Sequence, residues 1–263
     1  MRSMATDKHR RGGRRPAARI RKRPTTGSGS SGAGARAGPR RGLPPRPGEP
    51  GAQASSKPRS VEEEVRATAR PGQGDRAVRA FEQAVSLVER GRDAAAVRSA
   101  QEAKELAPRS GAVREILGIA LYRAERFREA LRELQAYRRI TGRLDQNHLI
   151  ADSHRALGAP AKALEPVREA LRARIPDDVR AEAAIVGASA LADLGRFEEA
   201  LSLVRSASTA RGGAKESDVR LWYATADLLA RAGRPREAVQ EFRKILRYDS
   251  GAFDVAERLA ALS

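Results

Sequence analysis

Apolar residues recur at helical spacing along most of the chain after residue 75. Two consecutive stretches show the pattern, with apolar residues at Ile116, Leu117, Leu121 and Tyr122, then at Ala130, Leu131, Leu134 and Tyr137. Spacings of three and four residues put these side chains on one face of a helix, and that face must be buried. The pattern predicts two amphipathic helices separated by a short turn.

A short motif of the type Gly-Arg-Phe-x-x-Ala stands between the two helices and recurs along the chain. Its five copies occupy residues 91–96, 125–130, 158–163, 195–200 and 233–238. Successive copies begin 34, 33, 37 and 38 residues apart. A period of this length predicts an array of helical repeats, in which each helix pair buries its apolar face against its neighbours.

Small residues occupy equivalent places in each predicted helix. In the first helix of each pair they are Ala84, Gly118, Ala151, Ala188 and Ala226; in the second they are Ala96, Ala130, Ala163, Ala200 and Ala238. Small contact residues allow two helices to approach closely. The glycine that opens most copies supplies the left-handed backbone that ends a helix, and Pro160 and Pro235 suit a helix start.

Period, helix–turn–helix unit and small-residue spacing together resemble the tetratricopeptide repeat. The resemblance implies an all-α protein, a right-handed α-solenoid of about five repeats. Counting 34 positions per unit, these begin near Ala77, Gly111, Leu144, Ala181 and Val219. We expect a repeat domain over residues 75–263, closed by a capping helix at 253–262, and a partial cap or linker over 61–74. Departures from the family pattern are Ala80, where a large residue is usual, and Ser250, where proline is usual.

The resemblance also implies a concave groove lined by the first helix of each repeat. Carried over position by position, the residues expected to contact a partner there are Phe81, Glu115, Tyr122, Arg123, Asp145, His148, Asp152, Arg155, Glu182, Tyr223 and Asp227. No Lys or Asn falls on a groove position, so the family's clamp for a C-terminal carboxylate is absent. The positions are apolar at the first repeat and mildly acidic beyond it, which suits a peptide or helix with basic residues and an apolar anchor.

Four of these residues, Asp145, His148, Asp152 and Arg155, lie three or four apart and are predicted to form one polar stripe. The stripe allows a partner contact, a solvated ladder of ion pairs or a His/Asp metal site, although a metal would need further ligands from adjacent helices. We predict no metal and no cofactor. The chain has no Cys and no Ser in a nucleophile elbow, so no activated nucleophile is evident.

Composition changes the picture only at the N-terminus. Residues 1–60 hold 16 Lys and Arg against two acids, a net charge of +14 out of +18 for the chain. Ten Gly and eight Pro accompany few large apolar residues, which predicts a disordered tail. Its basic block could contact nucleic acid through Arg10, Arg11, Arg14, Arg15, Arg19, Arg21, Lys22 and Arg23. Other possibilities are an anionic membrane surface, a transit peptide, the acidic groove of the same chain, or no fixed partner.

These observations favour a non-enzymatic, cytoplasmic scaffold or adaptor that binds a protein segment in the groove. The alternative is an RNA- or ribosome-associated factor that uses the tail; a third possibility is an accessory part of a larger enzyme. No apolar run is long enough to span a membrane, no apolar stretch of a secretory signal follows the basic start, and no small-molecule substrate is indicated. Deleting the tail should leave protein binding unchanged if the chain is a scaffold, and should abolish its function if it is an RNA- or ribosome-associated factor.

Overall fold

A computed structural model describes residues 60–207, 214–249 and 251–262. The chain divides into two units, residues 1–54 and 55–263, and all the described residues belong to the second. The basic block at Arg10–Arg23 therefore lies outside the described residues.

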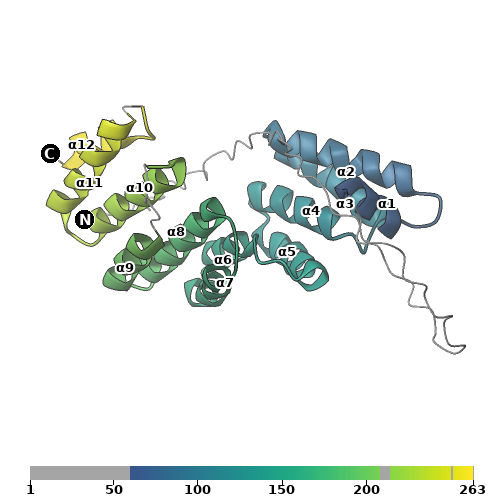
Figure 1. The fold of residues 1–263 in the computed structure, drawn as a ribbon, viewed down its shortest axis with the longest axis horizontal. Coiled ribbons are helices and arrows are strands. Elements are labelled where there is room, and N and C mark those ends of the chain that lie inside the picture. The colour runs from purple at the N-terminus through teal and green to yellow at the C-terminus, as the bar shows by residue number, and fades with distance from the viewer. Residues whose placement is uncertain (1–59, 208–213, 250, 263) are drawn as a thin grey trace, which may run out of the picture. The chain divides into compact units, whose positions relative to one another are not determined.

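The described residues fold into helices, without a strand (Figure 1). Their bounds are α1 Val61–Thr68, α2 Gly74–Glu89, α3 Asp93–Leu106, α4 Gly111–Arg123, α5 Phe127–Thr141, α6 Asn147–Ala156, α7 Pro160–Arg172, α8 Asp177–Asp193, α9 Phe197–Ala207, α10 Glu216–Arg231, α11 Pro235–Tyr248 and α12 Val255–Leu262. The predicted all-α fold with five helix pairs is confirmed.

Helices α2 to α11 form the five pairs, and we call their members first helices (α2, α4, α6, α8, α10) and second helices (α3, α5, α7, α9, α11). Each first helix packs on its own second helix and on the next first helix. Helices α3, α5, α7 and α9 each pack on the following first helix. The backbones of successive second helices stay farther apart, and side chains bridge them, as in the ion pairs of Lys104 with Glu133 (2.6 Å) and of Arg138 with Glu169 (2.5 Å). The first helices therefore form the inner layer of the solenoid and the second helices the outer layer.

Each pair is joined by the same tight turn. The residue that opens the turn has a left-handed backbone in all five copies, with φ of 71° at Gly91, 75° at Gly158, 76° at Gly195, 75° at Gly233 and 58° at Glu125. In each copy the next residue donates its N–H to the carbonyl five residues earlier, as Arg92 does to Leu87 and Arg126 to Leu121. This arrangement ends one helix and reverses the chain.

Glu125 is the only non-glycine residue at this position of the turn, and a side chain there is strained because its Cβ crowds the backbone. We expect Glu125→Gly to raise the free energy of unfolding by about 0.5–1 kcal/mol, the relief of strain less the entropy cost of glycine. Glu82→Gly, at an exposed position inside α2, should lower it by about 1 kcal/mol. Urea denaturation compares the two; a loss of stability in both variants would contradict this account of the turn.

The predicted small residues lie at the helix contacts. All ten are buried, and nine of them are alanines with no measurable exposure. At the tenth, Gly118 on α4, an added Cβ would lie 2.6 Å from Leu134 Cδ2 on α5. The small side chains are thus required by the close approach of the two helices of a pair.

Short helices pack on both ends of the repeats. At the N-terminal end of the repeats, Val65 of α1 is fully buried against α2 and its neighbours. The Glu64 carboxylate accepts hydrogen bonds from the Ser110 hydroxyl (2.7 Å) and the Gly111 amide (2.8 Å), where α4 begins. Glu64 therefore joins α1 to the start of α4. At the C-terminal end, α12 buries Val255 against α11.

Candidate functional site

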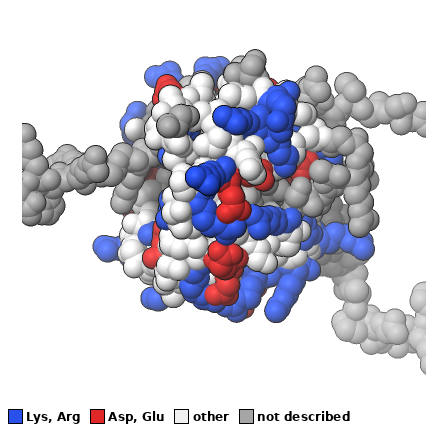
Figure 2. Space-filling model, turned by 90° about the vertical axis from the view of Figure 1, so that its left-hand side faces the viewer, with Lys and Arg blue, Asp and Glu red and all other residues white. Residues whose placement is uncertain are grey.

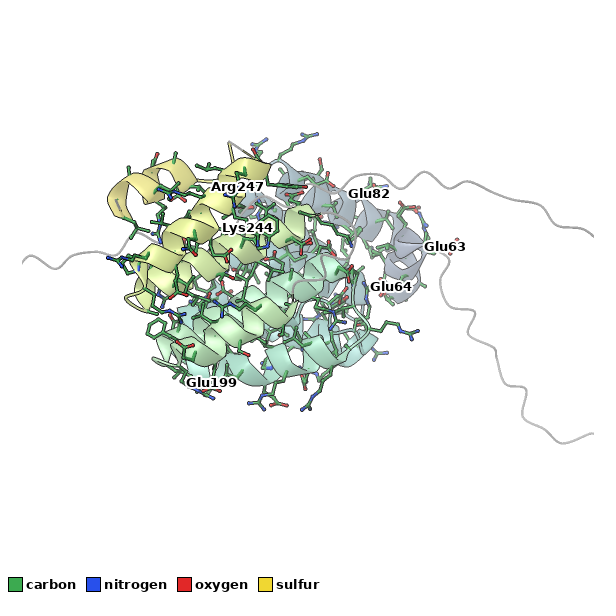
Figure 3. All side chains as sticks on the ribbon, turned by 60° about the vertical axis from the view of Figure 1, so that its left-hand side comes forward. Glu63, Glu64, Glu82, Glu199, Lys244 and Arg247 are labelled. Atoms are coloured by element: carbon green, nitrogen blue, oxygen red, sulfur yellow. The ribbon has the colours of Figure 1, made fainter. Side chains whose placement is uncertain are left out.

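The inner layer carries the residues that the sequence predicted as a groove. Phe81 lies on α2, Glu115, Tyr122 and Arg123 on α4, Asp152 and Arg155 on α6, Glu182 on α8, and Tyr223 and Asp227 on α10. We call the surface formed by the first helices the inner face. Charged side chains cover the described helices densely (Figure 3), and many of them pair with one another.

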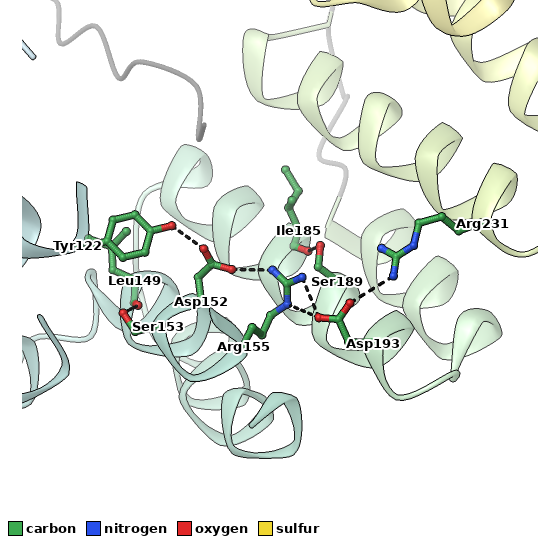
Figure 4. A network of polar contacts seen from close by, with 9 residues as sticks. All are labelled: Tyr122, Leu149, Asp152, Ser153, Arg155, Ile185, Ser189, Asp193 and Arg231. Carbon is green, nitrogen blue, oxygen red and sulfur yellow. Dashed lines mark hydrogen bonds and ion pairs between the residues drawn. The ribbon is translucent and has the colours of Figure 1, made fainter. Parts of the chain in front are cut away.

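A ladder of polar contacts joins four first helices along the inner face (Figure 4). The Tyr122 hydroxyl donates to Asp152 Oδ2 at 2.5 Å, and Arg155 donates to Asp152 Oδ1 at 2.6 Å. Arg155 also contacts Asp193 at 2.8 Å, and Arg231 reaches the other oxygen of Asp193 at 3.2 Å. We call these five residues the inner ladder; it links α4, α6, α8 and α10.

Tyr122 acts in the inner ladder as a hydrogen-bond donor that keeps its proton. Burial, together with the negative charge of Asp152, raises the pKa of the Tyr122 phenol well above its ordinary value. The hydroxyl therefore stays protonated at every physiological pH. Asp152 accepts from both Tyr122 and Arg155, so its carboxylate is satisfied within the protein.

Further predicted groove residues are held by partners outside the predicted set. Glu182 pairs with Arg220 at 2.5 Å, and Arg123 pairs with Asp93 of α3 at 2.9 Å. The remaining contacts join Gln146 to Glu115 (2.7 Å), the Tyr223 hydroxyl to Asp254 (2.6 Å), and Arg258 of α12 to Asp227. Burial raises the pKa of Glu182, while the Arg220 guanidinium opposes the shift.

The predicted stripe at the start of the third repeat is divided in the structure. Asp145 precedes α6 and accepts from the Tyr137 hydroxyl at 2.8 Å and from Arg143 at 2.5 Å. His148 is only 8% exposed, and its Nδ1 lies 3.0 Å from the Asp145 carbonyl oxygen. Burial lowers the pKa of His148 below its ordinary value, which favours the neutral ring. The stripe is therefore corrected: His148 is packed inside the repeat, whereas Asp152 and Arg155 belong to the inner ladder.

An apolar row remains on the inner face beside the ladder. It consists of the partly buried side chains of Phe81 and Val85 on α2 and of Ile119 and Tyr122 on α4. Glu82 and Glu89 of α2 are exposed and make no ion pair with another described residue. The sequence predicted Phe81 and Tyr122 at these positions. It gave no signal for the partners Asp93, Asp254 and Arg258, because they belong to other segments of the chain that only packing brings close.

Neither a cluster of metal ligands nor a membrane-spanning helix occurs among the described residues. No group of three or more His, Asp or Glu side chains among them comes together as metal ligands would. None of the described helices combines the length and the apolar composition that a bilayer span requires.

Comparison with known proteins relates the chain to helical repeat proteins. A tetratrico peptide repeat family model matches residues 149–247. No curated protein sequence matches the chain. Among solved structures, TTC0263, a thermophilic TPR protein of Thermus thermophilus, is 20% identical and superposes with a TM-score of 0.57, over 71% of this chain and 98% of its own length.

Two further structures show the same likeness. Residues 41 to the end of MamA from Desulfovibrio magneticus RS-1 are 15% identical, with a TM-score of 0.55 over 69% of this chain and 99% of that one. The apo form of the quorum sensor NprR from B. thuringiensis is 13% identical, with a TM-score of 0.60 over 76% of this chain and 60% of that one. At such identities the likeness establishes the fold alone. The family match over residues 149–247 covers most of α6, all of α7 to α10 and all but the last residue of α11, and the described helix pairs have the fold of tetratricopeptide repeats.

Proposed function

We propose that the chain is a protein-interaction scaffold whose inner face binds a segment of another protein. The observation that carries the proposal is the apolar row of Phe81, Val85, Ile119 and Tyr122, partly exposed on two adjacent first helices. Apolar and aromatic side chains at the centre of a groove are the usual anchors of a bound peptide or helix. The proposal includes no catalytic step.

The charges around the row define the kind of segment that fits. The inner ladder offers little unsatisfied charge, because its carboxylates and guanidinium groups already contact one another. Glu82 and Glu89, in contrast, are exposed at the side of the apolar row without an ion pair in the described chain. A segment with an apolar anchor flanked by Lys or Arg therefore complements this part of the inner face.

The test is a selection of peptides on the immobilised full-length protein, followed by affinity measurements on variants. We expect the selected peptides to share an apolar residue next to basic ones. Val85→Gln with Ile119→Gln should weaken their binding roughly tenfold or more, because central apolar contacts carry most of the affinity of such interfaces. Isothermal titration calorimetry measures the effect, and circular dichroism confirms that the helices are retained.

The control is Gln83→Ala, an exposed position on α2 that lies two residues from both Phe81 and Val85 and so faces away from the row. This variant should bind the peptides as the unaltered protein does. Peptides that bind the row variant and the control equally well would place the interaction elsewhere and contradict the proposal. The alternative of an RNA- or ribosome-associated factor depends on residues 1–59, outside the described part; it predicts that Arg→Gln substitutions at Arg10, Arg11, Arg14 and Arg15 abolish binding to RNA.

A further inference from the structure

We propose that the outer layer of the repeats binds the sugar–phosphate backbone of a nucleic acid. The surface is defined by equivalent positions in successive repeats. It consists of the second, fifth and ninth residues after the repeated alanine of each second helix. In the described chain these are Arg98, Gln101 and Glu105 on α3; Arg132, Gln135 and Arg139 on α5; Glu165, Arg168 and Arg172 on α7; Ser202 and Arg205 on α9; and Gln240, Arg243 and Arg247 on α11. We call this set the outer stripe.

The outer stripe is a regular feature and not a chance grouping of surface residues. Spacings of three and four residues keep its members on one face of each second helix. Every one of the fourteen side chains is exposed. The repeated alanines, which face the opposite way, are all fully buried, so the register of the stripe is fixed by the packing of each pair. The same row of positions thus returns on every second helix.

The composition of the stripe is strongly one-sided. It holds eight Arg and two Glu, and the other four positions are Gln or Ser, which gives a net charge of +6. The stripe contains no aromatic or aliphatic residue. The inner and outer layers therefore differ in chemistry, because the inner face has an apolar row and the outer stripe has none. Figure 2 looks onto the C-terminal end of the stack and shows Lys and Arg side chains spread over it, with acidic side chains between some of them.

The outer stripe also differs from the inner face in how its arginines are used, although other second-helix arginines such as Arg138 do pair with a carboxylate. On the inner face Arg123, Arg155, Arg220 and Arg231 each contact a carboxylate. In the outer stripe only Arg168 does so, with Glu165 at 2.6 Å. Arg132, Arg139, Arg172, Arg205, Arg243 and Arg247 make no ion pair with any residue of the described chain. Their guanidinium groups are available to an external anion, as at Arg247 beside Lys244 on α11 (Figure 3).

This chemistry fits a phosphate backbone better than the other polyanionic surfaces. Arg binds phosphate with paired N–H donors, and Gln and Ser are the neutral side chains that add hydrogen bonds to phosphate and sugar oxygens. A bilayer surface is a poorer match, because the stripe has no apolar side chain to enter the lipid. Without an aromatic residue to stack on bases, the surface is expected to bind without sequence preference.

The test measures binding of the full-length protein to a fluorescent 30-nucleotide RNA over a series of KCl concentrations, by anisotropy. The stripe variant carries Arg139→Gln, Arg172→Gln and Arg243→Gln. The control carries Arg70→Gln, Arg79→Gln and Arg90→Gln, three exposed arginines outside the stripe that also lack an ion pair in the described chain. Both variants lose the same net charge, and both keep residues 1–59.

We expect the stripe variant to bind roughly tenfold more weakly at low salt, and the slope of log affinity against log salt to fall by about 2, for three lost phosphate contacts on a single strand. The control should retain most of the affinity. Duplex DNA and RNA of a second sequence, used in parallel arms, distinguish the source of the phosphates and check that binding is independent of sequence. Peptides selected on the inner face should bind the stripe variant as they bind the unaltered protein. The RNA measurement therefore tests the outer stripe, and the peptide measurement tests the proposed function independently.

Three outcomes would overturn the proposal. Equal weakening in the stripe and control variants would mean that only net charge matters. Unchanged binding in the stripe variant would assign the interaction to another part of the chain. Displacement of RNA by poly-glutamate at an equal concentration of charge would mean that the outer stripe recognises an acidic polypeptide instead.

Discussion

Phe242→Ala is expected to lower the free energy of unfolding by about 3–5 kcal/mol, the usual cost of removing a buried aromatic ring. Phe242 on α11 has no exposed surface. Its ring packs edge-on against Tyr223 with the centroids 5.8 Å apart, and the Arg258 guanidinium of α12 lies 5.7 Å from its centre. The substitution therefore loosens α10, α11 and α12 together.

The loss should be local, because the core consists of separate clusters. One cluster joins residues of α8 to α12, and another lies among α2 to α5. Stability in repeat proteins is approximately a sum over neighbouring units. Hydrogen exchange of the variant should therefore accelerate in α10–α12 and stay nearly unchanged in α2–α4. Uniform acceleration along the chain would contradict this separation.

Phe253→Ala provides the matched control. Phe253 is 50% exposed and lies against Tyr223 with the ring centroids 4.9 Å apart. Removing its ring should cost less than about 1 kcal/mol, since little apolar area returns to water. A loss as large as that of Phe242→Ala would mean that the turn before α12, and not the ring of Phe242, holds this end of the solenoid together.

Asp152→Ala is expected to lower the free energy of unfolding by about 2 kcal/mol. The carboxylate accepts from the Tyr122 hydroxyl and from Arg155, and its side chain is only 25% exposed. Hydrogen bonds to a charged group contribute about 1.5–3 kcal/mol, and partial exposure reduces this. Removing the acceptor also leaves a partly buried hydroxyl without its partner. Denaturant unfolding measures the change.

Glu199→Ala is the control for the ladder. Glu199 pairs with Arg196 three residues earlier on the surface, with more than half of its side chain exposed. Such pairs contribute little, so the variant should unfold at nearly the same denaturant concentration as the unaltered protein. If Asp152→Ala cost no more than the control, the inner ladder would not stabilise the stacking of repeats. Its charges would then be better explained as contacts reserved for a partner.

The periodic features of this protein could be predicted from its sequence because they depend on neighbours along the chain. Helix faces follow from apolar spacing, and the five turns follow from the recurring motif. The motif predicted the turn at Glu125 correctly even though this copy has no glycine, and Glu125 adopts the left-handed backbone that glycine supplies elsewhere. The buried alanines were predicted for the same reason, because close helix contacts recur with the period of the repeat.

The site was predicted less completely than the fold. The resemblance placed Phe81 and Tyr122 on the first helices, where the structure has them. It offered His148 as part of an accessible stripe, but an i, i+3 pattern cannot show whether a neighbouring helix covers the residue. It also counted Asp152, Glu182 and Asp227 as acidic groove positions. Their partners Tyr122, Arg220 and Arg258 lie 30, 38 and 31 residues away, so the pairing is invisible to local spacing.

The sequence by itself determined the helices, the turns, the small contact residues and the two-layer arrangement, because each depends on interactions within about one repeat. Only the tertiary structure decided which charges are satisfied. Stacking brings carboxylates and guanidinium groups of successive first helices within 3.2 Å along the inner ladder. The ion pairs that bridge successive second helices, such as Arg138 with Glu169, use positions outside the outer stripe. Most arginines of the outer stripe therefore make no ion pair with another described residue.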